Sequence, residues 1–100
     1  MGGEGRDRLD GNDKDDVLLG EEGDDHLNGN DGNDRMFGGD GDDELIGRNG
    51  NDYMEGNSGD DFLRGRNGDD TLIGGTGDDR ANGSSGIDTC DAEEEVGCEL

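Results

Sequence analysis

The sequence predicts an all-β fold in which the chain coils into a flattened parallel β-solenoid of five turns. Three observations predict it: a nine-residue repeat without insertions, glycines held at fixed positions of the repeat, and one apolar residue at its eighth position. Ten units cover residues 2–91, and every unit begins with glycine and carries aspartate at its sixth position. A fixed period of this kind is typical of solenoids, and a disordered linker has no reason to keep it.

Each unit predicts a tight loop followed by a short strand. Glycines at positions one and four permit positive φ and close backbone approach, so positions one to six form the loop. Positions seven to nine form a three-residue strand whose middle side chain faces inward. Two units, or eighteen residues, make one turn, so odd-numbered and even-numbered units form separate parallel sheets. The predicted inward side chains are those of Leu9, Leu18, Leu27, Met36, Leu45, Met54, Leu63, Leu72, Ala81 and Cys90.

The composition excludes an ordinary hydrophobic core and several classes of partner. Asp and Glu number 30 against 8 Lys and Arg, the formal charge is −22, and only 23% of the residues are apolar. Such a chain is disordered unless a bound partner offsets the entropy of ordering it. The negative charge argues against nucleic acid and anionic membranes and favours cations. The longest aliphatic run, residues 17–19, is too short for membrane insertion.

The position-six aspartates predict two columns of carboxylates, one along each edge of the solenoid, because alternate units stack on one another. Neighbouring carboxylates would lie roughly 5 Å apart and repel strongly. A hard divalent cation with oxygen ligands removes this repulsion, and Ca²⁺ suits flexible loops better than Mg²⁺. Five loops per edge enclose four gaps, so up to eight Ca²⁺ are expected. The predicted carboxylate ligands are Asp7, Asp25, Asp43, Asp61 and Asp79 on one edge and Asp16, Asp34, Asp52, Asp70 and Asp88 on the other.

The units Gly-Gly-Asp-Gly-Asp-Asp-Glu-Leu-Ile (38–46) and Gly-Gly-Thr-Gly-Asp-Asp-Arg-Ala-Asn (74–82) resemble the repeats-in-toxin (RTX) nonapeptide of calcium-binding β-rolls. The resemblance covers residues 2–91 and implies a right-handed parallel β-roll with each Ca²⁺ between loops eighteen residues apart. It also implies that loop carbonyls join the carboxylates and that inner aspartates each bridge two ions. One site would then use Gly39, Gly41 and Asp43 from one loop with Gly56, Ser58 and Asp61 from the next. The glycines assigned as carbonyl ligands are Gly5, Gly20, Gly23, Gly29, Gly32, Gly38, Gly41, Gly47, Gly50, Gly56, Gly59, Gly65, Gly68, Gly74 and Gly83.

The function that the resemblance implies is a calcium-binding structural module of a secreted, extracellular and bacterial protein. We expect the chain to be disordered at low Ca²⁺ and rigid at the millimolar Ca²⁺ found outside cells. The alternative is an accessory module of a secreted hydrolase, lyase or epimerase whose catalytic domain lies outside this chain. We expect no enzymatic activity from these residues, because His26 has no partner at catalytic or metal-ligating spacing and no nucleophile motif is present.

Residues 92–100 are expected to form a capping tail after the repeats. Cys90 occupies the inward position of the last unit, and Cys98 lies in the tail. A disulfide between them would fold the tail over the open end of the solenoid and would imply an oxidising compartment. The alternative is a buried free thiol at Cys90 and an exposed one at Cys98.

Lys14 replaces the glycine expected at position four of the second unit. It brings a side chain and a positive charge to a predicted ligand loop. We therefore expect the gap between the Asp16 and Asp34 loops to bind Ca²⁺ weakly or not at all.

The outward side chains differ between the two predicted sheets. Positions seven and nine of the even-numbered units carry five apolar residues, whereas those of the odd-numbered units carry mostly charged and amide residues, with Ile46 and Phe62 as exceptions. The apolar face could contact a neighbouring domain or a second copy of the chain; the alternative is that strands simply tolerate scattered exposed apolar residues. The apolar outward residues of the even-numbered units are Val17, Leu19, Phe37, Tyr53 and Ile73.

Overall fold

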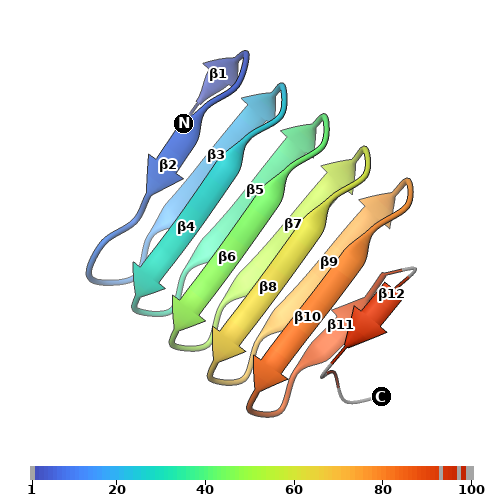
Figure 1. Cartoon of the computed structure of the whole chain (residues 1–100). Coiled ribbons are helices and arrows are strands. Elements are labelled where there is room, and N and C mark those ends of the chain that lie inside the picture. The colour runs from blue at the N-terminus through green and yellow to red at the C-terminus, as the bar shows by residue number, and fades with distance from the viewer. Residues whose placement is uncertain (1, 93, 97, 99–100) are drawn as a thin grey trace.

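The computed structural model describes residues 2–92, 94–96 and 98, and in this part of the chain the regular elements are all strands. They form two parallel six-stranded sheets that lie face to face, with short loops joining them alternately at either edge (Figure 1). No helix within the described ranges has the length and apolar character of a membrane span. The predicted all-β, parallel solenoid is confirmed.

Both sheets are ordered by the eighteen-residue turn. Leu18 pairs with Met36 and Leu27 with Leu45, so strand partners are one full turn apart. Sheet A contains β1 (Gly3–Glu4), β3 (Val17–Glu22), β5 (Arg35–Asp40), β7 (Tyr53–Ser58), β9 (Thr71–Thr76) and β11 (Thr89–Asp91). Sheet B contains β2 (Arg8–Asp10), β4 (His26–Asp31), β6 (Glu44–Asn49), β8 (Phe62–Asn67), β10 (Arg80–Ser85) and β12 (Glu94–Val96).

The strands are longer and the loops shorter than the sequence predicted. Eight of the twelve strands have six residues, covering positions seven to nine of one unit and one to three of the next. Only positions four to six remain as loop, so the prediction of a three-residue strand and a six-residue loop was wrong. Glu21 shows the reason: its φ of 84° bends the strand, yet it still pairs with Gly39 in the next turn. A local bend therefore does not end the pairing between turns.

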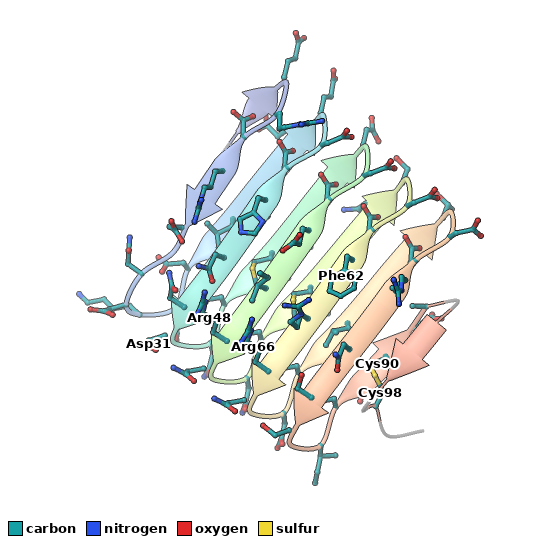
Figure 2. All side chains as sticks on the ribbon, viewed as in Figure 1. Asp31, Arg48, Phe62, Arg66, Cys90 and Cys98 are labelled. Carbon is teal, nitrogen blue, oxygen red and sulfur yellow. A yellow bond between two sulfur atoms is a disulfide. The ribbon has the colours of Figure 1, made fainter. Side chains whose placement is uncertain are left out.

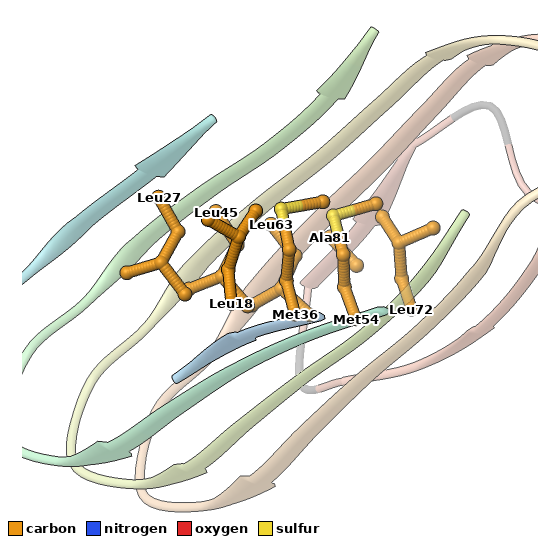
Figure 3. Close-up of a cluster of buried hydrophobic side chains, with 8 residues drawn as sticks. All are labelled: Leu18, Leu27, Met36, Leu45, Met54, Leu63, Leu72 and Ala81. Carbon is orange, nitrogen blue, oxygen red and sulfur yellow. The ribbon is translucent and has the colours of Figure 1, made fainter. Parts of the chain in front are cut away.

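The core is a single row of side chains between the sheets (Figure 3). The predicted inward positions are confirmed, since every member of the buried cluster comes from position eight of a unit. Because the molecule measures only 12 Å along its shortest axis, two sheets share this one layer of side chains. Leu9 and Cys90, in the first and last units, are partly buried against it. The buried cluster consists of Leu18, Leu27, Met36, Leu45, Met54, Leu63, Leu72 and Ala81.

The outward face of sheet A carries an aromatic pair beside a charged side chain. The rings of Phe37 and Tyr53 lie 6.0 Å apart, and the Arg35 guanidinium lies within 6 Å of both, at 5.7 and 5.8 Å. Val17 is 62% exposed, whereas Phe37 and Tyr53 are partly covered. Contact of this face with a neighbouring domain or a second copy stays a prediction.

The chain after the repeats continues sheet B. Strand β12 pairs with β10, placing the backbone of Glu94 opposite Arg80 and that of Val96 opposite Asn82. Cys90 and Cys98 form the predicted disulfide, with Cα atoms 5.7 Å apart. The disulfide closes a short loop that contains β12, so it ties the end of sheet B to the last strand of sheet A.

Replacing Cys98 with serine is expected to lower stability by roughly 2–3 kcal/mol, because the open chain gains conformational entropy when unfolded. The measurement is urea unfolding at saturating Ca²⁺. Wild-type protein in dithiothreitol serves as the control and should lose the same amount. An unchanged unfolding midpoint in both samples would contradict the prediction.

Candidate metal centres

The loops stack the ten position-six aspartates into two columns, hereafter the aspartate ladders. In the first ladder, the backbone N–H of Asp43 donates to Oδ1 of Asp61 in the next turn at 2.8 Å. In the second, the N–H of Asp52 donates to Oδ1 of Asp70 at the same distance. The same bond occurs in each of the eight gaps between turns. One carboxylate oxygen of each inner aspartate therefore reaches back to the preceding turn.

The other oxygen, Oδ2, has a different environment. The residues Asp34, Asp61 and Asp70 are at most 2% exposed, and their Oδ2 atoms are buried without a hydrogen-bond partner. Burial of an ionised carboxylate without a counter-charge is strongly unfavourable. The fold therefore leaves a regular series of oxygens that require positive charge. The aspartates with this orphaned Oδ2 include Asp7, Asp16, Asp25, Asp34, Asp43, Asp52, Asp61 and Asp70.

Position-one glycines make room beside these oxygens. A Cβ built on Gly20 would lie 2.5 Å from Asp25 Oδ2 and 2.5 Å from the carbonyl oxygen of Gly38 in the next turn. Both oxygens therefore border one small space. Their distances from the Cβ position are comparable with Ca²⁺–oxygen bond lengths of about 2.3–2.6 Å. Glycine is required at this position because any side chain would fill the space, not because of its φ. The same pairing of Oδ2 with a carbonyl recurs beside Gly2, Gly11, Gly29, Gly38, Gly47 and Gly56.

Position-four glycines are required for a second reason. Gly59 has a φ of 119°, and a Cβ on it would overlap the carbonyl oxygen of Gly41 in the preceding turn. That carbonyl therefore points from its own loop towards the next one. Ser58 also turns its carbonyl into this gap, accepting the N–H of Gly41 at 3.0 Å. Gly39, the other predicted ligand of the site, lies in β5 in register with Asn57.

Each gap thus presents two carboxylates and several backbone carbonyls. Nowhere among the described residues do three or more His, Cys, Asp or Glu side chains come together as a metal-binding group. This agrees with a site in which the backbone supplies the remaining ligands. Because the donors are all oxygen and include several backbone carbonyls, the set suits Ca²⁺ better than Zn²⁺ or Mg²⁺.

Lys14 keeps the backbone geometry of the glycine that it replaces. Its φ is 86°, and its carbonyl faces Gly32 as the other position-four carbonyls face the next loop. The N–H of Asp16 still donates to Asp34 at 2.8 Å. At Gly5, the matching first-turn position on the other edge, a Cβ would have nothing within 4 Å. Weak binding in this gap stays a prediction, now resting on the lysine's charge.

Burial raises the pKa of five inner ladder aspartates, because desolvation disfavours the charged form. The pKa of Asp43 and of Asp52 rises to about 6. The pKa of Asp61 and of Asp70 rises to about 7, and that of Asp34 is also raised. Hydrogen bonds from the preceding turn lower these pKa values in part, whereas the charges of neighbouring aspartates raise them further. Without bound cations, these five aspartates therefore bind protons more readily in the folded chain than in the unfolded one.

Calcium-stripped protein is expected to gain β-structure when the pH falls from about 8 to about 5. The ordinary aspartate pKa is 3.8, whereas the folded-state pKa is about 6 for Asp43 and about 7 for Asp61. Protonation therefore favours the fold, and this stabilisation is lost as the pH rises through 6 to 7. Calcium affinity should change in the opposite direction, because the ligands must be deprotonated. Circular dichroism in chelator checks the first effect, and a spectrum that does not change with pH would refute it.

Sequence reasoning missed a second ladder, formed by position five. The N–H of Asp60 donates to Oδ1 of Asp42, and the N–H of Asn51 donates to Oδ1 of Asn33, both at 2.8 Å. Here the side chain of one turn accepts from the next turn, which is the reverse of the aspartate ladders. The signal was available, since position five is Asp or Asn in eight of ten units. Neutral Asn serves equally in this ladder, so position five does not require charge.

The parallel solenoid and its buried, oxygen-lined gaps define a cation-binding repeat protein. A model of the RTX calcium-binding nonapeptide repeat, four copies long, matches residues 1–36, 28–63 and 55–90. The chain belongs to this family and is a calcium-binding structural module. Neither the curated proteins nor the solved structures that were compared with it contain a match.

Proposed function

We propose that this module is a calcium-responsive folding unit, disordered without Ca²⁺ and rigid at extracellular Ca²⁺ concentrations. The observation that carries the proposal is the series of buried Oδ2 atoms without a hydrogen-bond partner. Bound Ca²⁺ supplies the positive charge that these oxygens lack. The apolar core is one row of side chains, too small to hold 100 residues without that contribution. Each gap joins two turns, so binding at one site orders part of the next and the transition is cooperative.

We assign one Ca²⁺ to each gap, up to eight in all. Eight ions would bring the formal charge from −22 to about −6, an ordinary value for a soluble domain. In each site, the ladder aspartate of one turn contributes Oδ2 and that of the next turn contributes Oδ1. The carbonyls of positions two and four in one loop and of positions one and three in the next complete the proposed ligand set; beside Asp43 and Asp61 these are the carbonyls of Gly39, Gly41, Gly56 and Ser58. Inner aspartates therefore serve two ions each.

We further propose that the module works outside the cell, in a secreted bacterial protein, and that it has a structural and not a catalytic role. The Cys90–Cys98 disulfide supports an oxidising compartment. Extracellular Ca²⁺ in the millimolar range matches the expected affinities of about 10⁻⁴–10⁻³ M. A chain that is disordered at low Ca²⁺ would reach its folded form only after export.

Calcium titration tests this proposal directly. Circular dichroism in chelator should show a disordered chain, and a β spectrum should appear cooperatively as Ca²⁺ rises to about the millimolar range. Isothermal calorimetry should find about eight ions, or one fewer if the gap beside Lys14 fails to bind. Mg²⁺ should not substitute, because it requires tighter octahedral geometry. A chain that is equally compact in chelator and in Ca²⁺ would refute the proposal.

A further inference from the structure

The outward face of sheet B concentrates positive charge that calcium binding does not use. Strands β6, β8 and β10 carry four of the eight basic side chains of the chain, and Glu44 is their only acidic residue. We call this surface the arginine face. It is formed by Arg48, Arg64, Arg66, Arg80 and Phe62.

Three of these arginines lack an ionic partner despite the large excess of acid. The ion pair of Arg6 with Asp24 and the contact of His26 with Glu44, both at 3.5 Å, involve none of these three. Within the part of the chain that the structure describes, Arg48, Arg64 and Arg66 therefore form no ion pair. In a protein with 30 acidic residues, these three neighbouring arginines stay without an ion pair, and Glu44, the one acidic residue of β6, β8 and β10, contacts His26 instead.

The arginines also oppose one another across the sheet. Arg48 and Arg66 are register partners on adjacent strands, and like charges placed directly opposite are destabilising. Figure 2 shows both on the same face of sheet B, with Phe62 nearer the other end of the strands. Nε of Arg48 donates to Asn28 at 2.9 Å, but Nε of Arg66 is buried without an acceptor. The residue that corresponds to Asn28 one turn later is Ile46, whose side chain cannot accept a hydrogen bond from Arg66.

Phe62 extends the cationic surface along β8. The guanidinium of Arg64 lies 4.8 Å from the ring centroid, and that of Arg80 lies 5.7 Å from it. The contact of Arg64 with the ring is a cation–π interaction that does not use the N–H groups of this guanidinium, so they can make a bidentate contact with carboxylate. The face is therefore an ordered array of carboxylate-binding groups.

We propose that the arginine face binds an extended acidic peptide segment of a partner protein. Arg64 and Arg66 are two residues apart on one face of β8, which separates them by about 6.6 Å along the strand. Same-face carboxylates of an extended acidic peptide recur with the same two-residue period, so two can meet two arginines at once. Exposed aspartates such as Asp42 and Asp60 run along the edge of the roll. They repel a broad anionic surface but leave room for one narrow chain.

The proposal rests on the proposed function, because only the folded roll brings β6, β8 and β10 together. The test uses the calcium-saturated chain and a fluorescein-labelled peptide of six Glu-Ser repeats, followed by fluorescence anisotropy. A peptide of six Gln-Ser repeats is the matched probe and should bind at least tenfold more weakly. Single Arg48→Gln, Arg64→Gln and Arg66→Gln variants should each weaken binding by about two- to fivefold. Arg35→Gln, on sheet A, should leave binding unchanged.

Four outcomes would overturn this inference. The first is equal binding of the two peptides, and the second is unchanged binding when Arg48→Gln, Arg64→Gln and Arg66→Gln are combined in one variant. The third is an equal effect of Arg35→Gln, and the fourth is binding of hyaluronan oligosaccharides or phosphatidylglycerol vesicles in place of the peptide. Circular dichroism of each sample shows whether the roll has formed. It therefore distinguishes failure of the peptide-binding inference from failure of the folding proposal. If the roll forms in Ca²⁺ and no acidic peptide binds, the arginine face alone is refuted. If the roll does not form in Ca²⁺, the proposed function is refuted and the face does not exist.

Discussion

Replacing Asp61 with asparagine is expected to destabilise the calcium-loaded protein and to stabilise the calcium-free fold. Asp61 contributes to two gaps, so the variant should bind roughly two ions fewer than the wild type. Breaking a buried charge pair costs about 3–5 kcal/mol, against a total stability of about 5–15 kcal/mol for a domain. The calcium-loaded variant should therefore need much more Ca²⁺ to fold. Asparagine keeps the shape and the oxygen that accepts the Asp43 N–H, so packing is not the cause.

Without calcium the sign of the effect reverses. Burial raises the pKa of Asp61 to about 7, so at pH 8 the folded chain holds a buried, ionised carboxylate without a cation. Asparagine carries no charge and removes that penalty. In chelator at about pH 8, the variant should show more β-structure than the wild type. A merely structural aspartate would be harmed by the substitution in both conditions.

The adjacent Asp60 provides the matched control. Asp60 is exposed, and its Oδ1 accepts the N–H of Asp78 in the position-five ladder. Asn51 accepts the equivalent N–H on the other edge, so Asp60→Asn keeps the hydrogen bond. Circular dichroism and calorimetry should find Asp60→Asn close to the wild type. Equal losses of Ca²⁺ affinity in Asp60→Asn and Asp61→Asn would show that net charge, and not the buried ladder, governs binding.

Gly59→Ala is expected to be the most damaging of the small substitutions. The new Cβ would overlap the Gly41 carbonyl, and the φ of 119° is unfavourable for alanine. Pairing between turns holds both backbones, so neither can move away. Strain and overpacking together should cost about 3 kcal/mol or more. Because the Gly41 carbonyl is also a proposed ligand of Ca²⁺, the midpoint of the calcium titration should rise as well.

Gly5→Ala separates the steric effect from the conformational one. Gly5 has a similar φ of 98°, but a Cβ there has nothing within 4 Å because no turn stacks below it. This variant should lose only about 1 kcal/mol, from the left-handed backbone alone. Urea unfolding at saturating Ca²⁺ gives both values. If the two alanines cost the same, contact between turns does not explain the glycines at position four.

Much of the metal site was predictable from the sequence because the period is uninterrupted. Once eighteen residues make a turn, Asp43 must lie beside Asp61, and Leu45 must face inward. The different environments of the two oxygens of each carboxylate were not predictable. Oδ1 of Asp61 takes the Asp43 N–H while its Oδ2 stays buried without a hydrogen bond, which depends on the exact stacking of the loops. The space for a side chain beside Gly5, and by analogy beside Lys14, was not predictable either. It exists because no turn stacks below the first one.

The sequence by itself determined the repeat, the two sheets, the inward row and the aspartate columns. These follow from local spacing, because a nine-residue period repeats the same short-range choice ten times. Only the tertiary structure decided that the strands continue past the bend at Glu21. It also decided that Arg48 and Arg66 lie opposite each other, and that Nε of Arg66 has no hydrogen-bond acceptor where Ile46 replaces an amide. Those features depend on contacts between residues about eighteen apart whose identities vary from unit to unit. A regular repeat predicts the roles of its constant positions. The contacts of its variable positions are known only once the turns are stacked on one another.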